Sequence, residues 1–211
     1  MITPTFIEEG HRYVLPDGRD VPSVNQILKL AQSERILDKV PEARQYITIW
    51  PPAARSSAMS YGTQIHKDIE NWLKDGTEPV PERPEFRAFR GWWEHNKVRL
   101  VWSERILYTP EPEFVAGRAD ALIEWGVPDT EMAAHENCLT DFKTGKRVYG
   151  SSYLQIAAYT RMARKMGIPI NWAMILHLDS LGNATPHFLN EEQLDDYADI
   201  FNRLIAAVRE S

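Results

Sequence analysis

Three consecutive segments rich in β-forming residues constrain the fold of this chain more than any other feature. Residues 98–108, 114–125 and 135–142 carry many β-branched and aromatic side chains, and proline-rich or polar stretches separate them. The pattern over 152–166 then predicts a helix, and the apolar run over 170–178 predicts a buried strand. The order of these elements predicts an α/β core built on a mixed sheet.

Further elements are predicted before and after this stretch. At the N-terminal side, short strands are predicted at 6–7 and 13–15. A helix that Ser23 caps is predicted at 23–30, and another short helix at 43–50. Two longer helices follow at 53–74 and 84–96, with a loop of three prolines between them. At the C-terminal side, a strand at 185–189 leads to an amphipathic helix at 191–208, which Asn190 and Gln193 begin as a capping box.

The composition fits one globular domain and excludes several kinds of site. The chain has 211 residues, of which 43% are apolar and 26% charged, and no stretch is long enough for a membrane span. Cys138 is the only cysteine, so intramolecular disulfides, a cysteine zinc site and a four-cysteine iron–sulfur cluster are excluded. Because no secretory signal is recognisable, we expect a cytoplasmic protein. The net charge of −6 means that any phosphate-binding surface must be a local patch.

The pair Asp141 and Lys143 carries the strongest chemical signal. The two residues are two positions apart on a predicted strand, so their side chains lie on the same face. Gln155 and Tyr159, four positions apart on the next helix, also share a face. An acid and an amine at a strand end, backed by a polar helix, indicate a metal site that hydrolyses phosphoryl groups.

Three more side chains could complete such a site. Asp120 lies on the preceding strand and would approach Asp141 if the registers match. Two carboxylates about 4 Å apart repel by roughly 4 kcal/mol at an effective dielectric of about 20, so the pair needs a cation, a shared proton or a basic partner. A divalent metal is the most economical answer. His66 is expected to face the sheet from its helix, and Glu104 could complete the shell or hold a ligating water.

Five motifs together resemble, in order and spacing, the RecB-like exonuclease branch of the PD-(D/E)XK nuclease superfamily, without an iron–sulfur cluster. They are His66 in a G-x-x-x-H helix, Glu104 on a strand, Gly117-Arg118-Ala119-Asp120, Asp141-Phe142-Lys143 and Gln155-x-x-x-Tyr159. Residues 22–28 also look like an early segment of single-strand exonucleases in that branch. The resemblance implies a restriction-endonuclease-like core, in which helices flank a mixed central sheet. We expect a single nuclease domain over 1–211, with an N-terminal helical accessory region at 1–50 and the catalytic core at 51–211.

The resemblance also implies a role for each site residue. His66, Asp120, Asp141 and the backbone carbonyl of Phe142 would bind one or two Mg²⁺ or Mn²⁺ ions. Glu104 would assist a ligand, a water or a second ion, and Lys143 would position and activate the attacking water. Residues expected to support the site or to contact the substrate are Gln155, Tyr159, Lys146, Arg147 and Arg118.

The expected function is that of a metal-dependent deoxyribonuclease, an exonuclease acting on DNA ends or single strands in phage or bacterial recombination, repair or replication. The expected partners are single-stranded DNA or duplex ends, together with a single-strand-binding or recombination protein. A catalytically silent nucleic-acid-binding module and a restriction-type endonuclease remain alternatives. Taken singly, His66 could be a core histidine, Lys143 a partner for Asp141, and Glu104 a partner for Arg105 or another cation.

Overall fold

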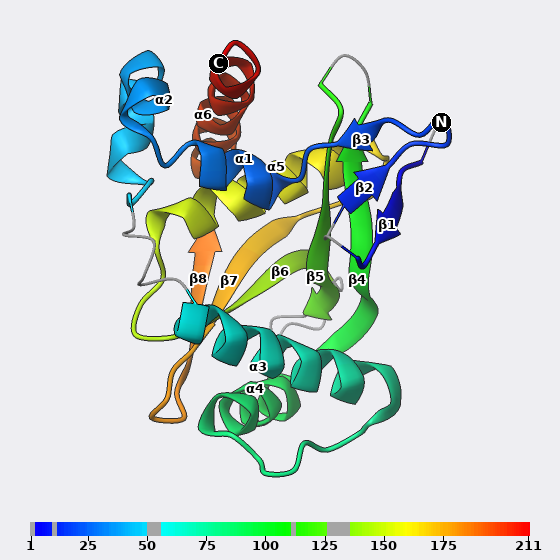
Figure 1. Ribbon diagram of the computed structural model, residues 1–211. Coiled ribbons are helices and arrows are strands. Elements are labelled where there is room, and N and C mark those ends of the chain that lie inside the picture. Colours follow the sequence, from blue (N-terminus) through cyan, green and yellow to red (C-terminus); the bar gives the residue numbers. More distant parts are fainter. Residues whose placement is uncertain (1–2, 10–11, 50–55, 111–112, 126–135) are drawn as a thin grey trace.

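A mixed five-stranded sheet forms the centre of the molecule (Figure 1). The computed structural model describes residues 3–9, 12–49, 56–110, 113–125 and 136–211, without the side chains of 56–60. The strands lie in the order β4 (Arg99–Thr109), β5 (Val115–Trp125), β6 (Glu136–Thr144), β7 (Trp172–Leu178) and β8 (Ala184–Leu189). Only β6 and β7 are parallel among these neighbours, and α5 (Gly150–Lys165) connects them. The predicted α/β core with a mixed sheet is confirmed.

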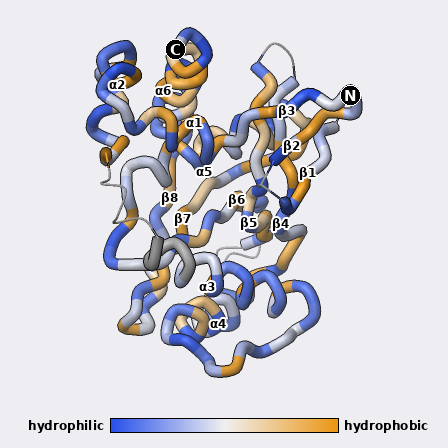
Figure 2. Tube along the Cα trace, in the orientation of Figure 1, coloured by the Kyte–Doolittle hydropathy of each residue, from blue (hydrophilic) through white to orange (hydrophobic). Residues whose placement is uncertain are grey.

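Helices cover both faces of this sheet. On one face α3 (Ser56–Asp75) and α4 (Pro84–His95) pack against the strands, and on the other face lies α5, backed by α1 (Val24–Leu30) and α6 (Glu191–Arg209). The core therefore has two main layers, one including Ile65, Phe86, Phe89, Phe142 and Leu176, the other including Ile27, Leu139, Leu154, Ile175 and Phe201. Figure 2 shows hydrophobic residues along the central strands and hydrophilic ones on the outer turns of α3 and α4. Within the described ranges, no helix combines the length and apolar character needed to cross a membrane.

The N-terminal region contains a small sheet as well as helices. The strands β1 (Thr5–Ile7), β2 (Arg12–Val14) and β3 (Asp20–Val21) pair in antiparallel fashion, as the two predicted short strands suggested. Ser23 caps α1 as predicted and forms a full capping box with Gln26. Residues of α1 and α2 (Glu34–Lys39) share the buried layer on the α5 side of the large sheet. The boundary predicted at residue 50 falls in the undescribed segment 50–55.

The helix predicted at 43–50 is wrong. The chain is helical earlier, in α2 and in a 3₁₀ turn, η1 (Pro41–Gln45), while 46–49 form no regular element. The missed signal is Ser33, whose hydroxyl oxygen accepts a hydrogen bond from the Ile36 amide and thereby starts α2. Pro41 then starts η1, because its fixed φ suits a first helical position.

Two local features place α3 beside the ends of the strands. Gly62 lies so close to the end of β6 that a Cβ there would be 3.1 Å from Oγ1 of Thr144. Gly76 ends α3 in a left-handed conformation, with φ of 78°, as the sequence predicted. The next turn of α3 after Gly62 thus lies over the edge where β5 and β6 stop pairing.

Candidate functional site

The two predicted acids lie where the β5–β6 ladder ends. Its last backbone pair is Ala121 with Thr140, and the same register extended by one residue places Asp120 opposite Asp141. There the Asp120 side chain takes the place of a backbone acceptor, because its Oδ2 accepts a hydrogen bond of 2.7 Å from the Phe142 amide. The Asp120 carboxylate is therefore held between the two strands.

His66 approaches Asp120 from α3. Its Nδ1 is 3.5 Å from Oδ2 of Asp120, so the expectation that His66 faces the sheet is confirmed. Burial alone would lower the pKa of His66, but the Asp120 carboxylate outweighs burial and raises it. Conversely, burial opposes ionisation of Asp120, yet the charge of His66 holds the pKa of Asp120 below its usual range. These two side chains form an ion pair that spans α3 and β5.

Asp141 and Lys143 lie side by side on β6, as their spacing predicted. Nζ of Lys143 is 2.6 Å from Oδ2 of Asp141, which is only 1% exposed. Despite this contact, neither carboxylate oxygen of Asp141 accepts a well-formed hydrogen bond from any residue that the structure describes. Burial raises the pKa of Asp141 to about 6, whereas the Asp141 charge outweighs burial at Lys143 and raises the pKa of that amine. Buried acceptors without hydrogen bonds are rare in native proteins and call for an ion, a water or a functional reason.

Glu104 lies on β4 across from Asp120. The flanking pairs Ser103 with Ala121 and Arg105 with Ala119 set this register. Glu104 has a φ of 53°, which places a non-glycine residue of a strand in the left-handed region at a cost of about 1–3 kcal/mol. Burial, followed by the charge of Asp120, raises the pKa of Glu104 to about 7.

Arg118, not Arg105, is the partner of Glu104. Nε of Arg118 lies 2.6 Å from Oε2 of Glu104, and the Arg118 guanidinium also covers the ring of Phe6 at 4.9 Å. Arg105 is exposed and lies over the Trp102 ring. Of the alternatives open for Glu104, the pairing with a cation other than Arg105 is therefore the one observed.

Gln155 and Tyr159 occupy the opposite side of the acids, on α5. The buried Tyr159 ring packs so tightly on Gly117 of β5 that a Cβ on this glycine would be 2.4 Å from Cε1 of the ring. The Tyr159 hydroxyl is 3.3 Å from Nε2 of Gln155, and the same Nε2 donates a 3.2 Å hydrogen bond to Oδ1 of Asn25. The pair thus links α5 to β5 and to α1.

Two basic residues expected to support the site or contact the substrate follow β6. Lys146 and Arg147 are exposed, and Arg147 lies over the Tyr149 ring. Three cations of α5 each pair with a carboxylate: Arg161 with Asp199, Arg164 with Glu191, and Lys165 with Glu113. Any basic surface at this end of the sheet therefore depends on Lys146 and Arg147.

Two polar residues of the site region escaped the sequence reasoning. Glu70 follows His66 by one helical turn, pairs with Lys67 at 2.9 Å, and helps to raise the pKa of Glu104. The four-residue spacing from His66 could have identified it. Asn25 lies in the segment 22–28 that resembles single-strand exonucleases, but its contact with Gln155 has no local signal because the two are 130 residues apart in the sequence.

The predicted metal ligands form ion pairs with neighbouring side chains and are not grouped around a common point. Among the described residues, no three side chains of His, Cys, Asp or Glu are grouped so as to hold a metal ion. Each acid is instead matched with a nearby cation, through the pairs Asp120–His66, Asp141–Lys143 and Glu104–Arg118. The donor types nevertheless fit Mg²⁺ or Mn²⁺, which prefer carboxylate and carbonyl oxygens, with Mn²⁺ also accepting an imidazole. The observation that favours a metal ion is that Oδ1 of the buried Asp141 has no partner among the described residues, while Oδ2 contacts only the Lys143 ammonium there.

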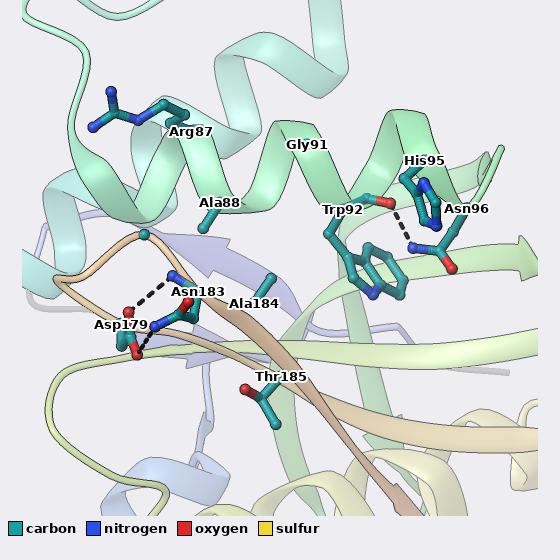
Figure 3. A pocket seen from close by; sticks show the side chains of 11 residues that line it. Arg87, Ala88, Gly91, Trp92, His95, Asn96, Asp179, Asn183, Ala184 and Thr185 are labelled. Carbon is teal, nitrogen blue, oxygen red and sulfur yellow. Dashed lines mark hydrogen bonds between the residues drawn. The ribbon is translucent and has the colours of Figure 1, made fainter.

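A surface groove of about 660 Å³ lies elsewhere, between α4 and the turn that joins β7 to β8. Figure 3 shows Trp92 and His95 on one side of it, and Asp179 hydrogen-bonded to Asn183 on the other. None of the predicted site residues lines this groove. The acids at the end of the β5–β6 ladder, rather than this groove, therefore define the candidate site.

Comparisons with known proteins leave the assignment to the chemistry of this site. No protein-family model and no curated protein matches the sequence. Among solved structures, a candidate exonuclease from Eubacterium rectale is similar, with 10% identity, coverage of 77% of this chain and 71% of that chain, and a TM-score of 0.47. The protein SSO0001 is similar at 12% identity, with coverage of 85% and 73% and a TM-score of 0.39. Scores and identities this low support no conclusion about activity.

Proposed function

We propose that this protein is a metal-dependent deoxyribonuclease of the RecB-like PD-(D/E)XK type, which removes nucleotides from DNA ends or single strands. The observation that carries the proposal is Asp141, a buried carboxylate across from Asp120, for which Lys143 is the one charged partner among the described residues. A buried acid in this state is costly to the fold unless its charge is used.

Four groups would hold the divalent ion in this proposal: the side chains of Asp120, Asp141 and His66, and the backbone carbonyl of Phe142. When bound, Mg²⁺ or Mn²⁺ would polarise a phosphoryl oxygen and lower the pKa of a bound water. Asp120 is suited to this role because its carboxylate is ionised and fixed by the Phe142 amide. His66 would have to give up its proton to bind the ion through nitrogen.

Lys143 would supply positive charge next to the reacting phosphate. Its pKa is raised by Asp141, so Nζ carries a proton at neutral pH. A fixed ammonium in a partly buried site stabilises the negative charge that accumulates on a phosphate during hydrolysis. Glu104, held by Arg118, would accept a hydrogen bond from water beside Asp120.

A catalytically silent module on the same fold explains these residues less well. Such a module could replace both Asp141 and Lys143 with apolar residues without losing stability, because a buried ion pair contributes little to stability compared with well-packed apolar side chains. The retention of two acids, an amine and an imidazole at one point therefore favours catalysis.

Purified protein should shorten end-labelled single-stranded and duplex DNA in Mn²⁺ or Mg²⁺, and a chelator should abolish the reaction. Asp141→Ala should lose the activity, whereas Asp199→Ala, which removes an exposed acid of α6, should retain it. A covalently closed circle should remain intact if the enzyme requires ends. Undiminished cleavage by a folded Asp141→Ala protein would refute the proposal.

A further inference from the structure

The start of α1 is hydrogen-bonded to β5 through the backbone, close to the candidate site. Ser23 forms a parallel bridge with Ala116, and the Ala116 amide donates a 3.0 Å hydrogen bond to the Pro22 carbonyl. Ala116 precedes Asp120 on β5 by four residues, and Gly117 between them holds the Tyr159 ring. The first turn of α1 is therefore fixed relative to the strand that carries Asp120.

Asn25 is the residue of this turn that reaches the site. Its Oδ1 accepts the 3.2 Å hydrogen bond from Gln155, whose Nε2 also lies 3.3 Å from the Tyr159 hydroxyl. The Tyr159 ring in turn packs against Gly117, three residues before Asp120 on β5. A short chain of hydrogen bonds thus leads from Tyr159, which packs on the strand that carries Asp120, through Gln155 to Asn25 at the surface.

The hydrogen bond from Gln155 also determines which way the Asn25 amide points. With Oδ1 turned toward Gln155, the Nδ2 group faces away from it, and within the described part of the chain Nδ2 donates to no acceptor. Asn25 is exposed, so this donor is available to a ligand. A neutral amide donor is a common contact for the phosphates of nucleic acids, because it recognises the backbone without reading the bases.

We propose that Asn25 donates a hydrogen bond from Nδ2 to the DNA phosphate next to the one that is cut. This inference rests on the proposed nuclease function and adds a substrate contact on the α1 side of the site. It also gives Gln155 a definite task, which is to orient the Asn25 amide. His66 reaches Asp120 from α3, on the other face of the sheet.

Two substitutions separate this role from a structural one. Asn25→Asp keeps an oxygen that can accept from Gln155 but replaces the donor with a negative charge facing the phosphate. Asn25→Ala removes both groups. We expect KM for a single-stranded oligonucleotide to rise about tenfold in Asn25→Ala and about a hundredfold in Asn25→Asp, with kcat changed less than about twofold in both. If Asn25 merely braced Gln155, Asn25→Asp would behave like the natural protein, and Asn25→Ala would lower kcat.

Asn202→Asp is the matched control, because it adds the same charge on α6, a helix that carries none of the candidate site residues, and it should leave KM unchanged. Fluorescence anisotropy of a labelled oligonucleotide in chelator should show the same order of affinities without cleavage. Normal KM and affinity in both Asn25 variants, in a protein that does cut DNA, would overturn this inference and leave the proposed function standing. A natural protein that neither cuts nor binds DNA would overturn both.

Discussion

At the scale of single residues, the two neighbouring aspartates have pKa values that are shifted in opposite directions. Asp120 accepts the Phe142 amide and pairs with His66, so its pKa is lowered. Asp141 is almost fully buried, and burial outweighs the charge of Lys143 and raises the pKa of Asp141 to about 6. Environments that shift two nearby carboxyl groups in opposite directions are typical of sites where the two have different tasks. We interpret Asp120 as a permanently ionised metal ligand. We interpret Asp141 as a ligand whose negative charge is neutralised by the metal ion when that ion binds.

Removal of the Lys143 ammonium should separate catalysis from metal binding. We expect Lys143→Ala to lower kcat on DNA by about a hundredfold or more, because charge on the phosphate is no longer offset. The Kd for Mn²⁺, measured by titration calorimetry, should stay within about threefold or become tighter, since a positive charge beside Asp141 is lost.

Lys146→Ala is the control for this substitution, because Lys146 is an exposed cation three residues further along the chain. It should affect KM more than kcat. A normal turnover rate in Lys143→Ala would show that Lys143 only pairs with Asp141.

At the scale of elements, the sequence predicts most of the strands and helices correctly, because long periodic segments carry a strong signal. The limits of β4, β5, β6 and α3 fall within a few residues of those expected. The short α2 was missed, since six residues hold too few apolar positions to show a period. The left-handed backbone of Glu104 could not be predicted either, because it lies inside a long β-rich segment and no glycine, asparagine or aspartate lies next to it.

The geometry of the site was predictable in part. Side chains on one strand or one helix were placed together correctly, as for Asp141 with Lys143 and Gln155 with Tyr159. Contacts between distant segments, such as Arg118 with Glu104 or Gln155 with Asn25, depend on register and tertiary packing, which no local pattern encodes. The roles of these residues in metal binding and catalysis stay predictions.

The packing of α5 on β5 can be tested at Gly117. We expect Gly117→Ala to destabilise the protein by about 1–3 kcal/mol, because the new methyl group would overlap the buried Tyr159 ring. Gly91→Ala is the matched control, since a Cβ at this position of α4 meets no atom within 4 Å. It should raise stability by about 0.5–1 kcal/mol through helix propensity. Urea unfolding that ranks the two variants equally would contradict this description of the α5–β5 contact.

At the scale of the whole molecule, the site exists only in the folded chain. Its residues come from α1, α3, β4, β5, β6 and α5, and lie between positions 25 and 159 of the sequence. Folding therefore buries acids that water would otherwise surround. The free energy of unfolding of the metal-free protein should show how much this burial destabilises the fold.

The contribution of these buried acids to the free energy of unfolding depends on pH. Glu104, with a pKa raised to about 7, and Asp141, with a pKa raised to about 6, bind protons more tightly when folded than when unfolded. Stability from such groups is present below their unfolded pKa values and is lost as pH rises through the folded ones. The pKa of His66 is also raised, so His66 also makes the protein less stable as the pH rises. The pKa of His187 is lowered, so His187 has the opposite effect.

We therefore expect the free energy of unfolding in chelator to fall by on the order of 1–2 kcal/mol between pH 5 and pH 8. Glu104→Gln should lessen this fall, because it removes the group with the highest shifted carboxyl pKa in the site. Denaturant unfolding at a series of pH values measures both. Stability that rises steadily over this range, or an unchanged slope in Glu104→Gln, would contradict the burial of these acids.

The most direct test of the central claim is an anomalous difference map from crystals soaked in Mn²⁺. We predict a peak bounded by the carboxylates of Asp120 and Asp141 and the imidazole of His66, with Lys143 displaced from Asp141. Crystals that take up Mn²⁺ elsewhere and leave Asp141 paired with Lys143 would contradict the claim that this is a metal-dependent nuclease site.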